Sequence, residues 1–147
     1  MRKVFAFFAS LLIAGMLASS ASAASPHFIG DPQVSTSGNS LTVGFKAAGL
    51  GNISSADFSL VGTVEVSSRC YTKSGNKPQA ANKQETLAVN STETFPVRNG
   101  QTTGSFTVTP LSTLRCPGGQ RVVIEGVTYD LTIYGPGGLV SDPIVSG

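Results

Sequence analysis

The feature that most constrains the fold is that no stretch from residue 24 onward keeps a helical apolar period over three turns. Apolar side chains instead alternate with polar or small ones in short runs that turn residues separate, as in the segment 41–46. Alternation of this kind is typical of strands with one buried face. One parity also links Phe58, Leu60, Val64, Val66 and Cys70, and the alternation repeats at Leu87 and Val89. The sequence therefore predicts an all-β domain.

A two-residue turn signal lies between two of these runs. Asn99-Gly100 separates 85–97 from 101–109. The pair is the strongest short-range hairpin signal, because a type I′ turn needs positive φ at both central positions. We therefore expect the two runs to form a β-hairpin.

The last long run changes parity along its length. Val122 and Ile124 lie on one parity, whereas the apolar side chains of residues 127–133 lie on the other. A β-bulge or turn at Gly126 would reconcile them. Residues 139–145 are expected to add a last short edge strand, whose pairing Pro143 limits.

Six or seven short antiparallel strands with turn signals between them predict an immunoglobulin-like β-sandwich, with a small β-barrel as the alternative. The longest stretch without apolar alternation is 72–84. We expect a loop there, either functional or a mobile connection.

The first 23 residues have the pattern of an export signal. Met1-Arg2-Lys3 is cationic, residues 4–18 are apolar except for Ser10 and Gly15, and small residues follow. The apolar run is short for a bilayer core, which needs about 20 residues, and A-x-A-like sites offer cleavage. We expect a signal peptide over 1–23 and a secreted single β-sandwich domain over 24–147, with no membrane span after cleavage.

Cys70 and Cys116 are the only cysteines. An even pair in an exported chain predicts a disulfide, the alternative being two unrelated buried thiols. A bridge that closes a loop of about 45 residues should contribute about 4 kcal/mol in the chain-entropy model.

Charge and histidine content narrow the function classes. Without residues 1–23 the chain has eight basic and eight acidic side chains, which excludes a whole-protein basic field and so predicts no nucleic-acid partner. Ser/His/Asp or Cys/His catalysis would have to use His27, the only histidine. Pro26 has no backbone N–H for an amino-terminal copper or nickel chelate. We therefore predict no catalytic residue, no metal site, no cofactor and no enzymatic activity, although a glycosidase-type carboxylate pair distant in sequence stays open.

The basic residues are unevenly placed along the chain. Most of them lie in the two segments that a Cys70–Cys116 bridge would draw together, and no carboxylate falls within 70–84 or 110–120. We expect a cationic pole around the disulfide, with Tyr71 and Asn76 adding contacts to an anionic partner. The alternative is that this loop is only solvated and that its lysines keep it soluble. The candidate binding residues are Arg69, Tyr71, Lys73, Asn76, Lys77, Lys83, Arg115 and Arg121.

Three segments carry a family resemblance, namely 45–52 (FKAAGLGN), 70–83 (CYTKSGNKPQAANK) and 116–120 (CPGGQ). They resemble those of small secreted bacterial β-sandwich proteins of the actinobacterial type, a family of unknown function. The resemblance implies export and the cysteine pair, and it implies no activity. Members carry a histidine before the loop proline, where this chain has Lys77, so the resemblance further weakens any metal role for that loop.

Our first functional hypothesis is a secreted non-enzymatic binding module whose partner is an anionic cell-envelope polymer or an extracellular protein. The second is a secreted enzyme inhibitor or toxin-like protein that uses 72–84 as an extended insert. The third is a small-ligand carrier, by analogy of fold alone with the secreted chromoprotein apoproteins. The sequence leaves the oligomeric state open.

Overall fold

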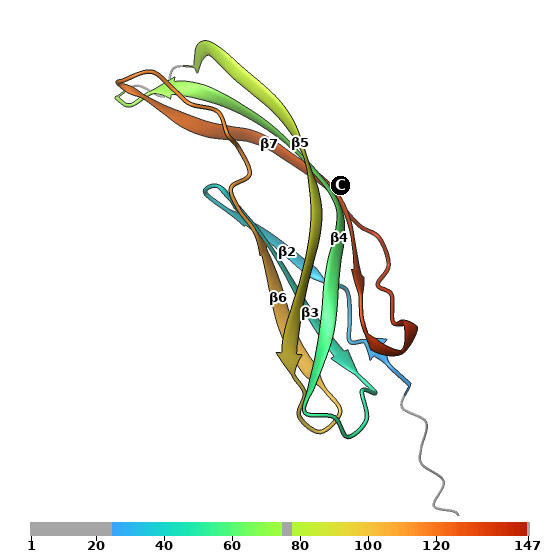
Figure 1. The fold of residues 1–147 in the computed structure, drawn as a ribbon. Coiled ribbons are helices and arrows are strands. Elements are labelled where there is room, and N and C mark those ends of the chain that lie inside the picture. The colour runs from blue at the N-terminus through green and yellow to red at the C-terminus, as the bar shows by residue number, and fades with distance from the viewer. Residues whose placement is uncertain (1–24, 75–77, 147) are drawn as a thin grey trace, which may run out of the picture.

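The computed structural model describes residues 25–74 and 78–146, and these residues form a β-sandwich of two antiparallel sheets (Figure 1). The all-β sandwich is confirmed, and the small barrel is not what forms. None of the described residues belongs to a helix long and apolar enough to cross a membrane. The elements are β1 (His27–Phe28), β2 (Gln33–Ser37), β3 (Ser40–Ala48), β4 (Ser55–Thr72), β5 (Pro78–Pro96), β6 (Thr102–Val108), β7 (Gln120–Tyr134), the 3₁₀ turn η1 (Pro136–Gly138) and β8 (Ile144–Val145).

Each sheet has four strands. In the first sheet β3 pairs with β6 along one edge, while β1 and β2 follow each other along the other edge. In the second sheet the order is β5-β4-β7-β8, so β5 is a terminal strand. The expected export signal over 1–23 lies outside the described residues.

The core forms between the facing sides of the two sheets, where the alternating apolar side chains predicted from the sequence are buried. Phe45 of β3 and Phe58 of β4 lie with their ring centroids 4.7 Å apart. Phe95 of β5 and Phe106 of β6 pack edge to face at 5.5 Å. Aromatic side chains bury more area than other side chains and pack favourably in offset and edge-to-face arrangements. The four rings therefore join the two sheets within the core.

The second sheet is longer than the first, and its excess length forms a projection that we call the arm. The arm comprises residues 67–74, 78–85 and 109–126: the adjoining ends of β4, β5 and β7 and the connection from β6 to β7. Figure 1 shows β4, β5 and β7 running on past the end of the first sheet. Sequence positions 72–84 were expected to form a loop, and this is wrong for most of them. Lys83 and Gln84 pair with Ser68 and Ser67 in a regular ladder.

The expected hairpin at Asn99-Gly100 is correct at the turn and wrong beyond it. Asn99 has φ 51° and Gly100 has φ 72°, and Arg98 pairs with Gln101 across the turn. The strands on either side then part, because β5 pairs with β4 in one sheet and β6 pairs with β3 in the other. The Asn-Gly turn therefore carries the chain from one sheet to the other.

The parity change in the last long run is resolved as expected. Ser67 pairs with Gly126 and Ser68 pairs with Ile124, which leaves Glu125 as the extra residue of a β-bulge. The expected last edge strand is also present, as the two residues of β8. The short strands β1 and β2 were not predicted, because β2 has a single apolar residue, Val34, and so shows no alternation.

Candidate functional site

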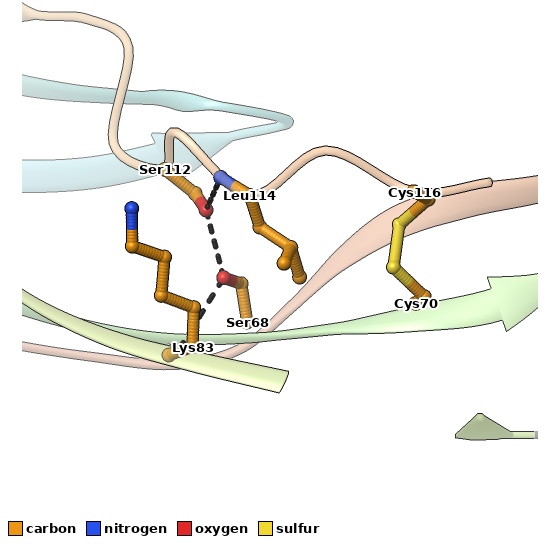
Figure 2. Close-up of a disulfide and its surroundings, with 6 residues drawn as sticks. All are labelled: Ser68, Cys70, Lys83, Ser112, Leu114 and Cys116. Carbon is orange, nitrogen blue, oxygen red and sulfur yellow. Dashed lines mark hydrogen bonds between the residues drawn. A yellow bond between two sulfur atoms is a disulfide. The ribbon is translucent and has the colours of Figure 1, made fainter. Parts of the chain in front are cut away.

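The Cys70–Cys116 disulfide lies in the arm (Figure 2). Its Cα atoms are 5.6 Å apart, and Cys70 is fully buried. The disulfide prediction is confirmed. The bond fastens the connection 109–119 to β4 on the side of the sheet that faces the core.

A hydrogen-bond network holds the same connection to β5. Glu85 accepts bonds from the backbone N–H of Thr113 at 2.8 Å and from the hydroxyl of Ser112 at 3.0 Å. The ammonium group of Lys83 lies 3.1 Å from the Glu85 carboxylate. The hydroxyl of Ser68, on β4, lies 2.7 Å from that of Ser112 (Figure 2). The connection is thus tied to β4 and β5 by side chains as well as by the disulfide.

These contacts shift the ionisation of Glu85. The hydrogen bonds from the side chain and backbone of Thr113 lower the pKa of Glu85 from 4.5 to about 2, against the opposing effect of desolvation. Hydrogen bonds from Lys83 and Ser112 act in the same direction. The side chain of Glu85 is 12% exposed, so the carboxylate relies on these partners more than on water.

A second set of contacts lies on the opposite face of the arm. Glu125, the extra residue of the bulge in β7, accepts a hydrogen bond from the hydroxyl of Tyr71 at 2.8 Å. Nε of Arg69 lies 3.5 Å from the Glu125 carboxylate and has no hydrogen-bond partner among the described residues. The bond to Glu125 raises the pKa of Tyr71. The bulge therefore places a carboxylate between two of the residues that the sequence assigned to an anion-binding site.

The predicted cationic pole is divided rather than continuous. Side chains alternate across a strand, so Arg69 and Tyr71 face away from the core, with Arg121 paired opposite Tyr71. Lys83 has the parity of Glu85 and faces the connection 109–119. Lys73 is exposed at the end of the arm.

Three further residues were predicted to belong to the anion-binding site. Arg115 is exposed on the connection 109–119. Asn76 and Lys77 lie outside the described residues. In the arm, β-pairing also brings the acids Glu85 and Glu125 beside two of the candidate cations, Lys83 and Arg69.

Sequence reasoning missed the residues that organise this region. Asn39, in the turn between β2 and β3, accepts a hydrogen bond from the N–H of Ser112 on its side-chain oxygen at 3.0 Å. Its backbone oxygen accepts a bond from the N–H of Leu111 at 3.2 Å. These contacts join segments more than 70 residues apart, so no local pattern in the sequence signals them.

The described part of the chain offers open hollows on its surface. One of about 600 Å³ lies between the β2–β3 turn and the edge of β7, lined by Asn39, Ser112, Leu114, Arg121, Val122 and Ile124 among others. Its walls combine apolar and polar side chains. Within residues 25–74 and 78–146, no group of three or more His, Cys, Asp or Glu side chains is placed to hold a metal ion.

The arm is thus a three-stranded sheet, closed on its core-facing side by a disulfide-bonded connection and carrying cations on both faces. Comparison with known proteins finds no family model, no curated protein and no solved structure that matches this chain. The family resemblance drawn from the sequence therefore stays a prediction.

Proposed function

We propose that the chain is a secreted, non-enzymatic binding module that contacts an anionic extracellular polymer with its arm. The observation that carries the proposal is the separation of charge along the molecule. The arm has five basic and two acidic side chains, whereas the other described residues have two basic and six acidic ones. The basic set in the arm is Arg69, Lys73, Lys83, Arg115 and Arg121, and the acidic set elsewhere is Asp31, Asp57, Glu65, Glu93, Asp130 and Asp142.

The local pairing supports the end of the arm as the contact region. Glu125 lies against Arg69 and Glu85 lies against Lys83, so both acids of the arm are engaged by cations. Lys73 and Arg115, both exposed, form no salt bridge with any residue in the described ranges. An excess of positive charge at one end attracts a polyanion, although the whole domain is close to neutral.

The fixed geometry of the arm supports the same proposal. The disulfide and the Glu85 network hold the connection against the sheet, so binding would not have to order a free loop. Attraction between exposed charges is screened over about 8 Å at physiological salt. Binding should therefore depend on ionic strength.

The strand connectivity supports the immunoglobulin-like interpretation of the sandwich. The first sheet contains β2-β3-β6 in that order, and the second has the order β5-β4-β7-β8. The chain crosses between the sheets from β3 to β4, from β5 to β6 and from β6 to β7, as expected of that class, and β4 and β7 are adjacent at the centre of the second sheet. The disulfide differs from that of antibody domains, which joins the two sheets. Here it joins β4 to the connection before β7.

The test is retention on immobilised polygalacturonate and on immobilised poly(glycerol phosphate), followed across a salt gradient. We expect the Lys73→Gln, Arg115→Gln double variant to elute from both polymers at lower salt than the parent. The matched control is Lys46→Gln, Arg98→Gln, which removes the same charge from exposed positions outside the arm. The proposal fails if the two double variants elute together, or if the parent is not retained at low salt. The inhibitor and carrier hypotheses stay predictions.

A further inference from the structure

The terminal strand β5 presents an open backbone edge. It pairs with β4 on one side, and no other described strand adds to its outer side. From residue 84 to residue 95 no backbone hydrogen bond joins this edge to another described segment. Unpaired N–H and C=O groups on an edge strand are a template for pairing with another chain.

The edge is also long and regular. Pairing with β4 is uninterrupted from Asn82 to Pro96, and the register irregularity lies beyond it, toward Pro78. Natural edges are protected by prolines, bulges or charges. In β5 the prolines and the register irregularity lie at the ends of the strand. Charged side chains are therefore the only one of these protections on the stretch between them, and they decide which chain can pair there. The edge of β7 in the arm differs, because its bulge interrupts any ladder.

We propose that two copies of this chain pair through β5 in an antiparallel, twofold-symmetric dimer with Ala88 on the axis. The two second sheets then form one continuous sheet. The inference does not rest on the proposed polymer binding, which is tested at Lys73 and Arg115.

Charge complementarity selects a second copy as the partner and fixes the register. With Ala88 on the axis, Lys83 faces Glu93 of the second copy, and the same pair forms again on the other side of the axis. Both side chains have the same parity along β5, so they lie on the same face of the joint sheet. Lys83, whose ammonium group also contacts Glu85, is 44% exposed, and Glu93 is exposed.

The neighbouring registers lack this match. Residues that face each other in an antiparallel pair lie on the same side of the sheet, and in two copies of β5 this requires the same parity. The twofold axis therefore passes between two copies of one residue. An axis at Val89 sets Glu85 against Glu93 of the second copy, and like charges directly opposite destabilise a sheet. An axis at Leu87 sets Lys83 against Ser91 and forms no ion pair. The Ala88 register is therefore the one that the charges favour.

The charge separation of the whole molecule points the same way. In an antiparallel pair the arm of one copy, with its excess of basic groups, lies beside the acidic body of the other. Nearest the axis, the side chains on the outer face of β5 are Thr86, Ala88 and Asn90, all exposed and uncharged. They add neither repulsion nor bulk at the axis.

A cysteine at the axis tests the register. Directly opposed residues in an antiparallel pair have Cα atoms about 4.5 or 5.5 Å apart, within the range that a disulfide spans. With oxidised glutathione as oxidant, Ala88→Cys should form a covalent dimer, whereas Thr86→Cys alone should not. An equimolar mixture of Thr86→Cys and Asn90→Cys should couple, because these positions face each other across the axis. Equal coupling of Ala88→Cys and Thr86→Cys overturns the proposal.

Sedimentation equilibrium of the unmodified protein tests the dimer itself. We expect a mass that rises with protein concentration toward twice that of one chain. Glu93→Lys should weaken association about tenfold or more, because it replaces two ion pairs with two repulsions. Glu65→Lys is the control, since it makes the same charge change on the outer face of β4. A monomer mass at every concentration, or equal weakening by both variants, overturns the proposal, whereas loss of polymer retention alone bears only on the proposed function.

Discussion

Glu85 accepts hydrogen bonds from Ser112 and Thr113 while it pairs with Lys83, so one carboxylate joins β5 to the connection 109–119. Its lowered pKa shows that the folded chain favours the ionised form. A group of this kind makes the stability of the fold depend on pH.

A Glu85→Gln variant should be less stable than the parent at neutral pH, with a lower midpoint in urea denaturation. The pKa of Glu85 is about 2 in the folded chain and 4.5 ordinarily, so its contribution is complete above about pH 4.5 and is lost as the pH falls through 2. The difference between parent and variant should therefore shrink between these two values. Glu65→Gln, at an exposed carboxylate outside the arm, should leave the stability nearly unchanged.

At the scale of the element, β4 is the strand that belongs to both the sandwich and the arm. Its centre passes close to β7 at Gly62, which has φ +150° and pairs with Leu131. A Cβ built there would overlap the carbonyl oxygen of Asp130 and would lie 2.9 Å from Cα of Leu131. Because both obstacles are backbone, no side-chain movement could relieve them.

We expect Gly62→Ala to destabilise the fold by about 2 kcal/mol or more, since it adds strain at positive φ to a backbone overlap. Thermal or urea unfolding measures the change. Gly44→Ala, within β3, is the matched control, because its added Cβ would meet its nearest neighbour at 3.8 Å, an ordinary contact. Equal stability of the two variants would show that β4 and β7 do not approach closely at this point.

The disulfide has a separate effect on the connection between β6 and β7. Replacing Cys70 and Cys116 together with Ala should lower the free energy of unfolding by about 4 kcal/mol, from the entropy regained by a loop of about 45 residues. Amide hydrogen exchange should rise first in residues 110–118, while the ladder between β3 and β6 keeps its protection. Uniform loss of protection in both regions would contradict this account of the arm.

The sequence predicted the elements that bury one face and missed those that do not. β3 and the sandwich half of β4 follow from alternation, because their apolar side chains fill the core. Residues 82–85, in the arm half of β5, are all polar, so they show no alternation although each of them pairs with β4. The candidate site was also predicted only in part. The disulfide was predicted from the sequence, whereas the contact between Glu125 and Arg69 depends on a strand register and a bulge that only long-range pairing determines.

At the scale of the whole molecule, the described residues divide into a basic arm and an acidic body. In a dimer paired through β5 the two arms would point in opposite directions. Two contact ends on one particle would let a weak polymer contact at one end raise the effective concentration of the other. The two proposals are thus independent in their tests and complementary in their consequence.

The strands of the arm continue into the sandwich without a break, since β4 and β7 each run through both parts. A pull on the end of the arm would therefore act along these strands and be shared by the whole ladder of hydrogen bonds between them. Such a ladder resists sliding as a unit, whereas a flexible linker would stretch before it passed any force on. Tension applied at the end of the arm would therefore pass directly to the core of the sandwich.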